Sequence, residues 1–407
     1  MKKLLLLPVA LMSLSLSLFS CSNNDDPTPD PSQDSVSFDN LPADSGNKPT
    51  QEQMSKTVAE YVDQVVVPTY KEMLDRMTAL HKAITKFYEY NGSDMRTAQN
   101  LIDDAADAWR AVREPWEQSE AFLYGVADLG QYDPSLDSWP LDKNGIEQII
   151  KSGDFSKIDG STEAAQNLRG FHTAEKMLFQ DGDSRKADTF TDKNEKTYLK
   201  LVADRMLSDT EELYKGWVEG LGSGDVAASY GDAMKKHDGS SAYAGLSSVY
   251  QALEMILNGD NGMGGISNEV GTAKIKDPVD AWNSSNKDKN DPNNPGVLAV
   301  ESWYSWNSLA DYENNIVSIK NAYFGGRDKD VESASDNSLH ALTKIINPTL
   351  DSLMVVQIDA TIDAIQQIPA PFRNNLDAQT EINKAIDECA KLTKGLDKVR
   401  AKLANAD

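Results

Sequence analysis

Apolar side chains recur every three or four residues along most of the chain after residue 50, and this spacing is typical of the buried face of an α-helix. The first stripe runs from Val58 to Leu80 and passes Pro68, where we expect the helix to be kinked or interrupted. No two segments combine strand-like alternation with a hairpin turn, so a sheet is not expected. The pattern predicts an all-α protein.

A second apolar stripe, over residues 101–125, contains a proline inside the predicted helix. Pro115 has no amide hydrogen, so it leaves backbone groups near position 111 without a helical partner and bends the helix. Arg113 and Glu120 lie on either side of this bend. We therefore expect this helix to carry site residues as well as core residues.

His172 and Glu175 form the most informative polar pair, in a segment expected to be one helix that begins at Ser161 or Thr162 and ends at Gly182. Residues three apart lie on one helical face, so the imidazole and the carboxylate can converge on one point. This geometry suits two metal ligands or an acid–base pair. A chain with four histidines and many acids also produces such a pair by chance, so spacing alone leaves both interpretations open.

A helix rich in polar residues is predicted over residues 301–325. Ser308, Asp311 and Asn315 share one of its faces. Ser, Asn and Asp have poor helix propensity because their side chains compete for backbone hydrogen bonds. These polar groups are therefore expected either to face solvent or to line a site.

The rest of the second half is predicted to contain one long loop and further helices. Residues 258–296 are rich in Gly and Asn but lack the strand and the Gly-Lys-Ser/Thr sequence of a phosphate site. Three later stripes predict helices over residues 338–346, 349–368 and 377–403. We assign two helical bundles, residues 51–225 with the His-x-x-Glu pair and residues 226–407.

The N-terminus has the features of an export signal. Residues 1–20 begin with two lysines and continue as an apolar run, which predicts a signal peptide. The junction before Cys21 resembles a bacterial lipobox, which implies cleavage there and a lipid on the cysteine; a plain signal peptide is the alternative. Residues 21–50 are polar and are expected to form a disordered tether. The expected location is the bacterial cell envelope, as an outer-membrane lipoprotein that is periplasmic or surface-exposed.

Charge and cysteine content exclude several classes of protein. The formal net charge of −24 would repel nucleic acid and an anionic membrane surface. The chain has two cysteines, so a lipid on Cys21 leaves Cys389 without a disulfide partner. Contact with a membrane is therefore expected only through the lipid anchor.

Three separated motifs, in this order along the chain, resemble those of the imelysin-like family. They are Trp109-Arg110 through Glu120-Ala121-Phe122 with Gly125, then Gly170-Phe171-His172-Thr173-Ala174-Glu175, then Glu301-Ser302 through Asp311, Asn315, Tyr323 and Gly325. Proteins of that family are two packed helical bundles with a site in the interdomain cleft. The family is labelled a metallopeptidase because its founding member was described as insulin-cleaving, and related members are iron-regulated envelope proteins connected with iron uptake.

The resemblance implies roles for seven side chains. His172 and Glu175 match the Gly-x-His-x-x-Glu motif, and the ligands of a divalent metal, iron or zinc, are expected to be His172, Glu175, Glu120 and Asp311. A bound small ligand or cofactor is expected to contact Arg113, Ser302 and Trp306.

The residue chemistry ranks three functions. A zinc peptidase commonly uses His-Glu-x-x-His, which this chain lacks, whereas one histidine with several carboxylates suits iron or another divalent ion. Divalent-metal binding in iron acquisition, with an envelope iron-transport component as partner, is therefore ranked first. A metal-dependent peptidase with Glu175 and His172 as catalytic residues is second. A non-catalytic module that binds a peptide or partner through Trp303 and Trp306 is third.

Overall fold

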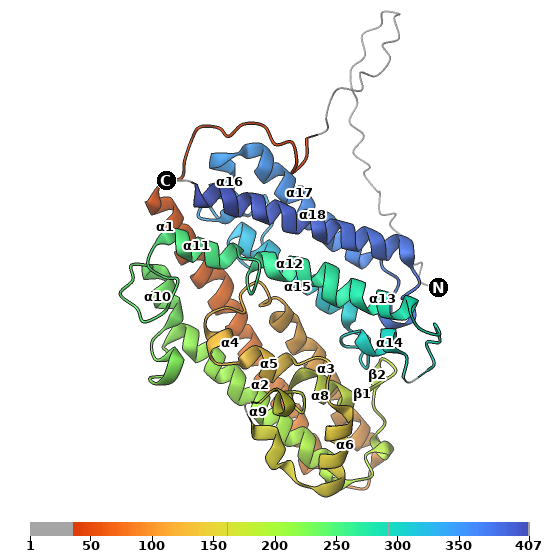
Figure 1. Ribbon diagram of the computed structural model, residues 1–407. Helices are drawn as coiled ribbons and strands as arrows, with labels where there is room; N and C mark the ends of the chain where they lie inside the picture. Colours follow the sequence, from red (N-terminus) through yellow and green to blue (C-terminus); the bar gives the residue numbers. More distant parts are fainter. Residues whose placement is uncertain (1–35, 161, 292, 406–407) are drawn as a thin grey trace, which may run out of the picture.

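Figure 1 shows the computed structural model of the chain, which describes residues 36–160, 162–291 and 293–405. The predicted signal peptide, Cys21 and Ser161 lie outside these described residues. Within the described ranges, no helix is long and apolar enough to cross a membrane.

Helices account for nearly all the regular structure, which confirms the predicted all-α class. In chain order the α-helices are α1 (Gln51–Tyr61), α2 (Val67–Glu89), α3 (Met95–Glu117), α4 (Val126–Leu129), α5 (Tyr132–Asp137), α6 (Lys143–Ser152), α7 (Glu163–Gln166), α8 (Gly170–Leu178), α9 (Lys193–Val218), α10 (Tyr230–Lys236), α11 (Val249–Leu257), α12 (Met263–Glu269), α13 (Asp277–Asn283), α14 (Pro295–Ala299), α15 (Ser308–Phe324), α16 (Leu339–Ile346), α17 (Pro348–Gln366) and α18 (Gln379–Ala404). Two π-helical segments, Val62–Val66 and Val270–Lys276, continue α1 into α2 and α12 into α13; four short 3₁₀ turns are Phe155–Asp159, Ala187–Thr189, Gly224–Val226 and Phe372–Asn374. The strands β1 (Phe179–Gln180) and β2 (Asp183–Ser184) pair antiparallel as a short hairpin.

The helices form two packed groups. In the lower part of Figure 1, α2 lies along both α3 and α9, and α8 packs against α3 and α9. In the upper part, α18 packs against α17, α12 and α16. Helix α15 contacts both α3 and α17, so it joins the two groups. The division of the chain at residue 225 stays a prediction.

Pro68 is accommodated by the π-helical segment Val62–Val66, which precedes it. The Val67 amide donates to the Val62 carbonyl, one residue further back than in an α-helix. This widened turn lets the chain continue into α2 although Pro68, in the first turn of α2, has no amide to donate. The predicted interruption at Pro68 is therefore a local change of helix type.

Pro115 lies inside α3, and the carbonyl it leaves free has found another partner. Arg76 Nη1 donates to the Ala111 carbonyl oxygen at 2.7 Å. The prediction that backbone near position 111 loses its helical partner is thus confirmed, and a side chain from α2 satisfies it.

The prediction of one helix around His172 is wrong. The segment forms α7, a break and then α8, which begins at Gly170. Gly170 has φ +84°, and a Cβ there would lie 2.3 Å from the Leu136 carbonyl oxygen, so the chain turns sharply beside α5. Gly182 lies in the β1–β2 turn with φ +86° and not at the end of the helix.

The start of the second polar segment is also not helical. Residues 301–307 form turns, and α15 begins at Ser308. Ser302 and Trp306 have φ values of 51° and 61°, which a right-handed helix cannot contain. The predicted face shared by Ser308, Asp311 and Asn315 does lie on α15, where all three are buried.

The later part of the predicted tether is packed against the protein. Phe38 is buried, and its ring lies beside Gly395 of α18. The Ser45 amide donates to the Ile346 carbonyl at 2.9 Å, and the Asn347 side chain donates to Asp44 at the same distance. One apolar anchor and these hydrogen bonds hold residues 36–50 in place.

Candidate metal centre

A group of ionisable side chains is buried where α3, α5, α8 and α15 meet. We call it the charge cluster; its members are Arg113, Glu117, Glu120, Asp137, His172, Glu175, Lys274, Glu301 and Asp311. The residues come from both groups of helices and from the turn at 301–307. Burial of so many charges is costly unless each finds a partner.

Arg113 is the central cation of the charge cluster, and its side chain has no exposed surface. Its Nη1 lies 2.5 Å from Asp137 Oδ1, and its Nη2 lies 3.2 Å from Glu301 Oε1 and 3.1 Å from Asp311 Oδ2. It also forms an ion pair with Glu117, one turn further along α3. Burial disfavours the charged form, but the carboxylates, Asp137 foremost, raise the pKa of Arg113 well above its usual value.

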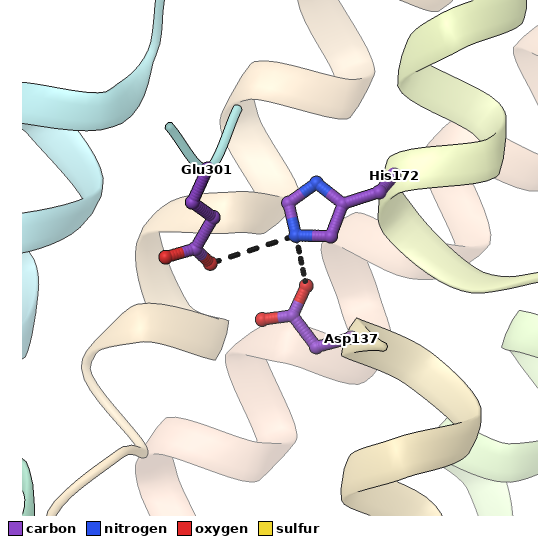
Figure 2. Close-up of side chains that lie close together, drawn as sticks. All are labelled: Asp137, His172 and Glu301. Atoms are coloured by element: carbon purple, nitrogen blue, oxygen red, sulfur yellow. Dashed lines mark ion pairs between the residues drawn. The ribbon is translucent and has the colours of Figure 1, made fainter. Parts of the chain in front are cut away.

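Figure 2 shows the carboxylates of Asp137 and Glu301 beside one ring nitrogen of His172, and Glu175 lies beside the other nitrogen. Its Nδ1 lies 3.1 Å from Glu175 Oε2, while its Nε2 lies 3.2 Å from Asp137 Oδ1 and 3.5 Å from Glu301 Oε1. Nε2 is buried and makes no well-formed hydrogen bond, although two carboxylates are near it. Such an atom fits a metal ligand better than a structural hydrogen bond.

The protonation state of His172 follows from these surroundings. Burial lowers the pKa of His172, but Asp137, Glu175 and Glu301 more than reverse this and hold the pKa well above its usual value. His172 is therefore an imidazolium when no ion is bound, and a bound cation would take the place of its Nε2 proton.

Glu175 holds the imidazole in position. Its Oε1 accepts hydrogen bonds from the backbone amide and the hydroxyl of Ser305, both at 2.8 Å, which leaves Oε2 for His172 Nδ1. A carboxylate that orients a histidine in this way fixes which ring nitrogen is free to bind a metal. The turn at 301–307 thus supplies a positioning contact that a continuous helix would not offer.

Asp137 and Glu301 remain charged beside His172. Burial opposes ionisation of both, but Arg113 lowers the pKa of Asp137, and Lys274, whose Nζ is 2.9 Å from Glu301, lowers the pKa of Glu301 to about 2. The Trp116 indole also donates to Asp137 at 2.6 Å. Both carboxylates are therefore ready to ligate a cation.

A second group of carboxylates, Glu117, Glu120 and Asp137, shares one member with the first. One oxygen of each lies within 4.8 Å of the other two, as do the ligand atoms of Asp137, His172 and Glu301. Burial raises the pKa of Glu117 and Glu120 well above the usual value. These two side chains hold protons when no ion is present.

Such protons reduce the negative charge of the charge cluster. Its six carboxylates face three cations, an excess of three negative charges if all are ionised. Burial raises the pKa of Glu117, Glu120 and Asp311, so bound protons offset part of this excess. A divalent cation would offset the excess in their place by displacing protons.

A cavity of about 270 Å³ adjoins the charge cluster and gives access to it. Glu120, Asp137, Glu301 and Lys274 line it, together with carboxylates outside the cluster such as Asp133. Burial raises the pKa of Asp133 to about 7. Both groups of helices contribute to this lining; an interdomain cleft stays a prediction.

The similarity to known proteins agrees with this geometry. The sequence profile of the family described as imelysin matches residues 66–399. The chain belongs to the imelysin family. Membership confirms the resemblance carried by the three motifs.

Individual imelysin-family relatives extend this result. The iron-regulated protein A of Synechococcus elongatus is 26% identical over 322 residues, covering 79% of this chain and 78% of that protein. The crystal structure of a protein from Parabacteroides distasonis, described as an iron-regulated protein A precursor, has 66% identity and a TM-score of 0.87 over 90% of this chain and all of that one. An imelysin-like protein from Psychrobacter arcticum, 13% identical, has a TM-score of 0.60 over 87% of this chain and 95% of its own, which shows the shared fold.

The structure brings most of the predicted site residues of this imelysin-family chain together. His172, Glu175, Arg113 and Asp311 belong to the charge cluster, and Ser302 donates to Asp311 Oδ2 at 2.5 Å. Glu120 lies in the second carboxylate group, next to the cavity.

Three of the predicted residues, Trp306, Glu175 and Asp311, have surroundings that make them less suited to bind an ion directly. Trp306 lies against Gly182 in the β1–β2 turn and is 39% exposed, and its predicted contact with a small ligand stays a prediction. Both oxygens of Glu175 are engaged, with Ser305 and with His172 Nδ1. Asp311 accepts from Asn307 at 2.7 Å as well as from Ser302 and Arg113, so it is largely saturated by donors.

Sequence reasoning missed four members of the charge cluster, Glu117, Asp137, Lys274 and Glu301. Two of them carried a local signal: Glu117 follows Arg113 by one helical turn, and Glu301 precedes Ser302 in the third motif. Asp137 and Lys274 lie outside the three motifs, and only the fold brings them to the site.

Proposed function

We propose that this imelysin-family protein binds a divalent cation, iron foremost, in the charge cluster with Asp137 as the central ligand. The observation that carries the proposal is that His172 Nε2 and one oxygen each of Asp137 and Glu301 all lie within 4.8 Å of one another, with Nε2 at 3.2 and 3.5 Å from the two oxygens. One imidazole among carboxylates suits iron and other divalent ions that accept mixed nitrogen and oxygen ligands.

Asp137 is the residue on which the site depends. It belongs to both the His172–Glu301 group and the Glu117–Glu120 group, so it can ligate an ion in either. Arg113 pairs with its Oδ1, which also faces His172, and the Trp116 indole donates to its Oδ2. Arg113 and Trp116 therefore fix the Asp137 carboxylate in position. The cations of the cluster do not by themselves neutralise all of its carboxylates.

The function supported for this chain is iron acquisition in the cell envelope. Two relatives are named iron-regulated protein A, which supports iron as the ion. The proposal also includes a lipid anchor at Cys21 and a partner that belongs to an envelope iron-transport system.

Replacing Cys21 with Ser tests the lipid anchor. The replacement should abolish incorporation of labelled palmitate in cells, and labelling that persists would contradict the anchor.

A metal-dependent peptidase ranks second because the site offers one imidazole. The described part of the chain places the other histidines elsewhere: His81 pairs with Asp204, His340 pairs with Asp351, and His237 ends α10. The adjoining cavity of about 270 Å³ is also small for an extended polypeptide. Cleavage of an unfolded polypeptide that requires both metal and Glu175 would reverse this ranking.

Calorimetric titration with iron(II) under anaerobic conditions tests the proposal. We expect His172→Gln to weaken binding by about 100-fold or more, because it removes a direct ligand. His340→Gln is the matched control, since His340 is also buried and paired with a carboxylate. Equal iron affinity in His172→Gln and the unaltered protein would contradict the proposal.

A further inference from the structure

A second cavity, of about 620 Å³, lies between α6, the β1–β2 hairpin and the start of α9. We call it the aromatic pocket, because Phe179, Trp303 and Tyr304 line it. These elements lie close together at one end of the lower group of helices (Figure 1). The volume is within the range of about 300 to 1,000 Å³ that small-molecule sites occupy.

The aromatic wall of this pocket is fixed before any ligand arrives. The Trp303 and Tyr304 rings stack with their centroids 3.9 Å apart and an interplanar angle of 24°. The Arg373 guanidinium lies 4.5 Å from the Trp303 centroid. Phe179 packs edge to face against Trp109, with centroids 5.2 Å apart. A rigid apolar surface of this kind binds a flat ligand at little entropic cost.

Most carboxylates around the aromatic pocket already have partners in the protein. Glu195 pairs with Arg185 at 2.7 Å, and Asp192 caps the start of α9. Asp181 lies 3.9 Å from Arg373. Of these three acids, Glu195 has a close ion pair, Asp192 accepts backbone amides, and Asp181 is mostly exposed.

Two lysines in the same lining are not neutralised. Lys176 is half-buried at the end of α8, and over the described residues its ammonium has no ion pair and no hydrogen bond. Lys151, which is exposed, also has no such partner in that part of the chain. Glu147 is the remaining carboxylate of the lining. The lining holds four carboxylates and three cationic side chains, so the feature that favours an anion is the half-buried Lys176 ammonium, which has no close ion pair among the described residues, and not the net charge of the pocket.

We propose that the aromatic pocket binds a small organic anion in which a carboxylate is attached to an apolar ring. Lys176 pairs with the carboxylate, and the ring packs against Trp303 and Tyr304, the partly exposed aromatic side chains of the lining. A half-buried ammonium without a partner gains a charge-assisted hydrogen bond from such a ligand, and the ring buries apolar surface. This site is independent of a metal in the charge cluster.

Binding of 2-naphthoate to the purified protein, measured by calorimetry, tests the proposal. We expect 2-naphthoate to bind at least about tenfold more tightly than 2-naphthylmethanol, which has the ring without the charge, or hexanoate, which has the charge without the ring. Lys176→Met should weaken 2-naphthoate binding by about tenfold, because it removes the charge and keeps the length of the side chain. Trp303→Leu should also weaken it.

Two results would overturn the proposal. One is the absence of 2-naphthoate binding at millimolar concentration, and the other is equal affinity in Lys176→Met. Lys344→Met is the matched control, since Lys344 is an exposed lysine of α16 outside the pocket, and its replacement should leave binding unchanged. A circular dichroism spectrum like that of the unaltered protein confirms that the Lys176→Met variant is folded.

Discussion

Two buried histidines of this protein each have a carboxylate beside Nδ1, but the rest of their surroundings differ. His172 Nδ1 lies 3.1 Å from Glu175, and His340 Nδ1 lies 2.8 Å from Asp351. Asp351 also accepts from the Tyr323 hydroxyl at 2.9 Å, so aromatic and hydroxyl groups complete that site. His172 instead faces further carboxylates at its second nitrogen. A histidine–carboxylate pair alone therefore does not indicate a metal site, whereas the additional buried carboxylates around His172 do favour one.

The largest expected difference between the two sites is in stability. Arg113→Met should lower the free energy of unfolding by about 3–5 kcal/mol, because it leaves several buried carboxylates without their cation. Asp351→Asn should cost about 1 kcal/mol, since an amide keeps part of the hydrogen bonding to His340 and Tyr323. Urea denaturation measures both values. Equal losses of unfolding free energy in the two variants would show that the charge cluster depends on its cation no more than the His340 site depends on Asp351.

The second expected effect is a dependence of stability on pH. Burial raises the pKa of Asp133, beside the charge cluster, to about 7, so the folded state keeps a proton that the unfolded state releases. Stability of the metal-free protein should therefore fall as pH rises from about 4 to 7. Asp133→Asn should remove about 1–2 kcal/mol of this fall, allowing for solvent around a partly exposed carboxyl. An unchanged pH profile of urea denaturation would refute the assignment.

A smaller effect should distinguish the two carboxylate groups. Glu120 is buried in the second group, and over the described residues its carboxyl has no hydrogen-bond partner. Glu120→Gln should leave the metal-free protein as stable as the unaltered protein, or stabilise it by about 1 kcal/mol. The reason is that it removes a buried acid and keeps the shape of the side chain. Iron affinity should fall if the ion lies between Glu117, Glu120 and Asp137. Unchanged affinity would place the ion with His172 and Glu301.

The smallest expected effect concerns the support of His172. Ser305→Ala removes one of two hydrogen bonds to Glu175 Oε1 and keeps the backbone amide, so we expect a loss of about 0.5–1.5 kcal/mol in unfolding experiments. Iron affinity should fall severalfold as the imidazole becomes less well oriented. The control is Ser318→Ala, at a buried serine of α15, which should change stability by a similar amount without affecting iron affinity.

Local sequence signals account for most of the helices and for several of their ends. Asp94 caps α3, Asp142 caps α6 and Asp192 caps α9, each with a side-chain oxygen that accepts a backbone amide of the first turn. Apolar spacing was sufficient for the long helices because their buried faces are continuous in sequence. The break before α8 was missed because it depends on how closely Gly170 approaches α5.

The charge cluster was only partly predictable, for a different reason. His172 and Glu175 lie on one helix, so their spacing shows that they can meet. Asp137 and Lys274 are brought in from other parts of the chain, and no local pattern distinguishes them from surface charges. The turn at 301–307 was read as helix because the left-handed conformations of Ser302 and Trp306 depend on tertiary contacts that sequence spacing does not show.

The position of Arg113 has a consequence for how the protein handles an ion. A guanidinium held among four carboxylates is a permanent counter-ion attached to the chain, so the cluster does not need a metal in order to fold. Many small metal-binding domains unfold when their ion is removed. Under the proposed function, folding of this protein would not depend on metal supply, which suits a protein that takes up an ion and releases it again.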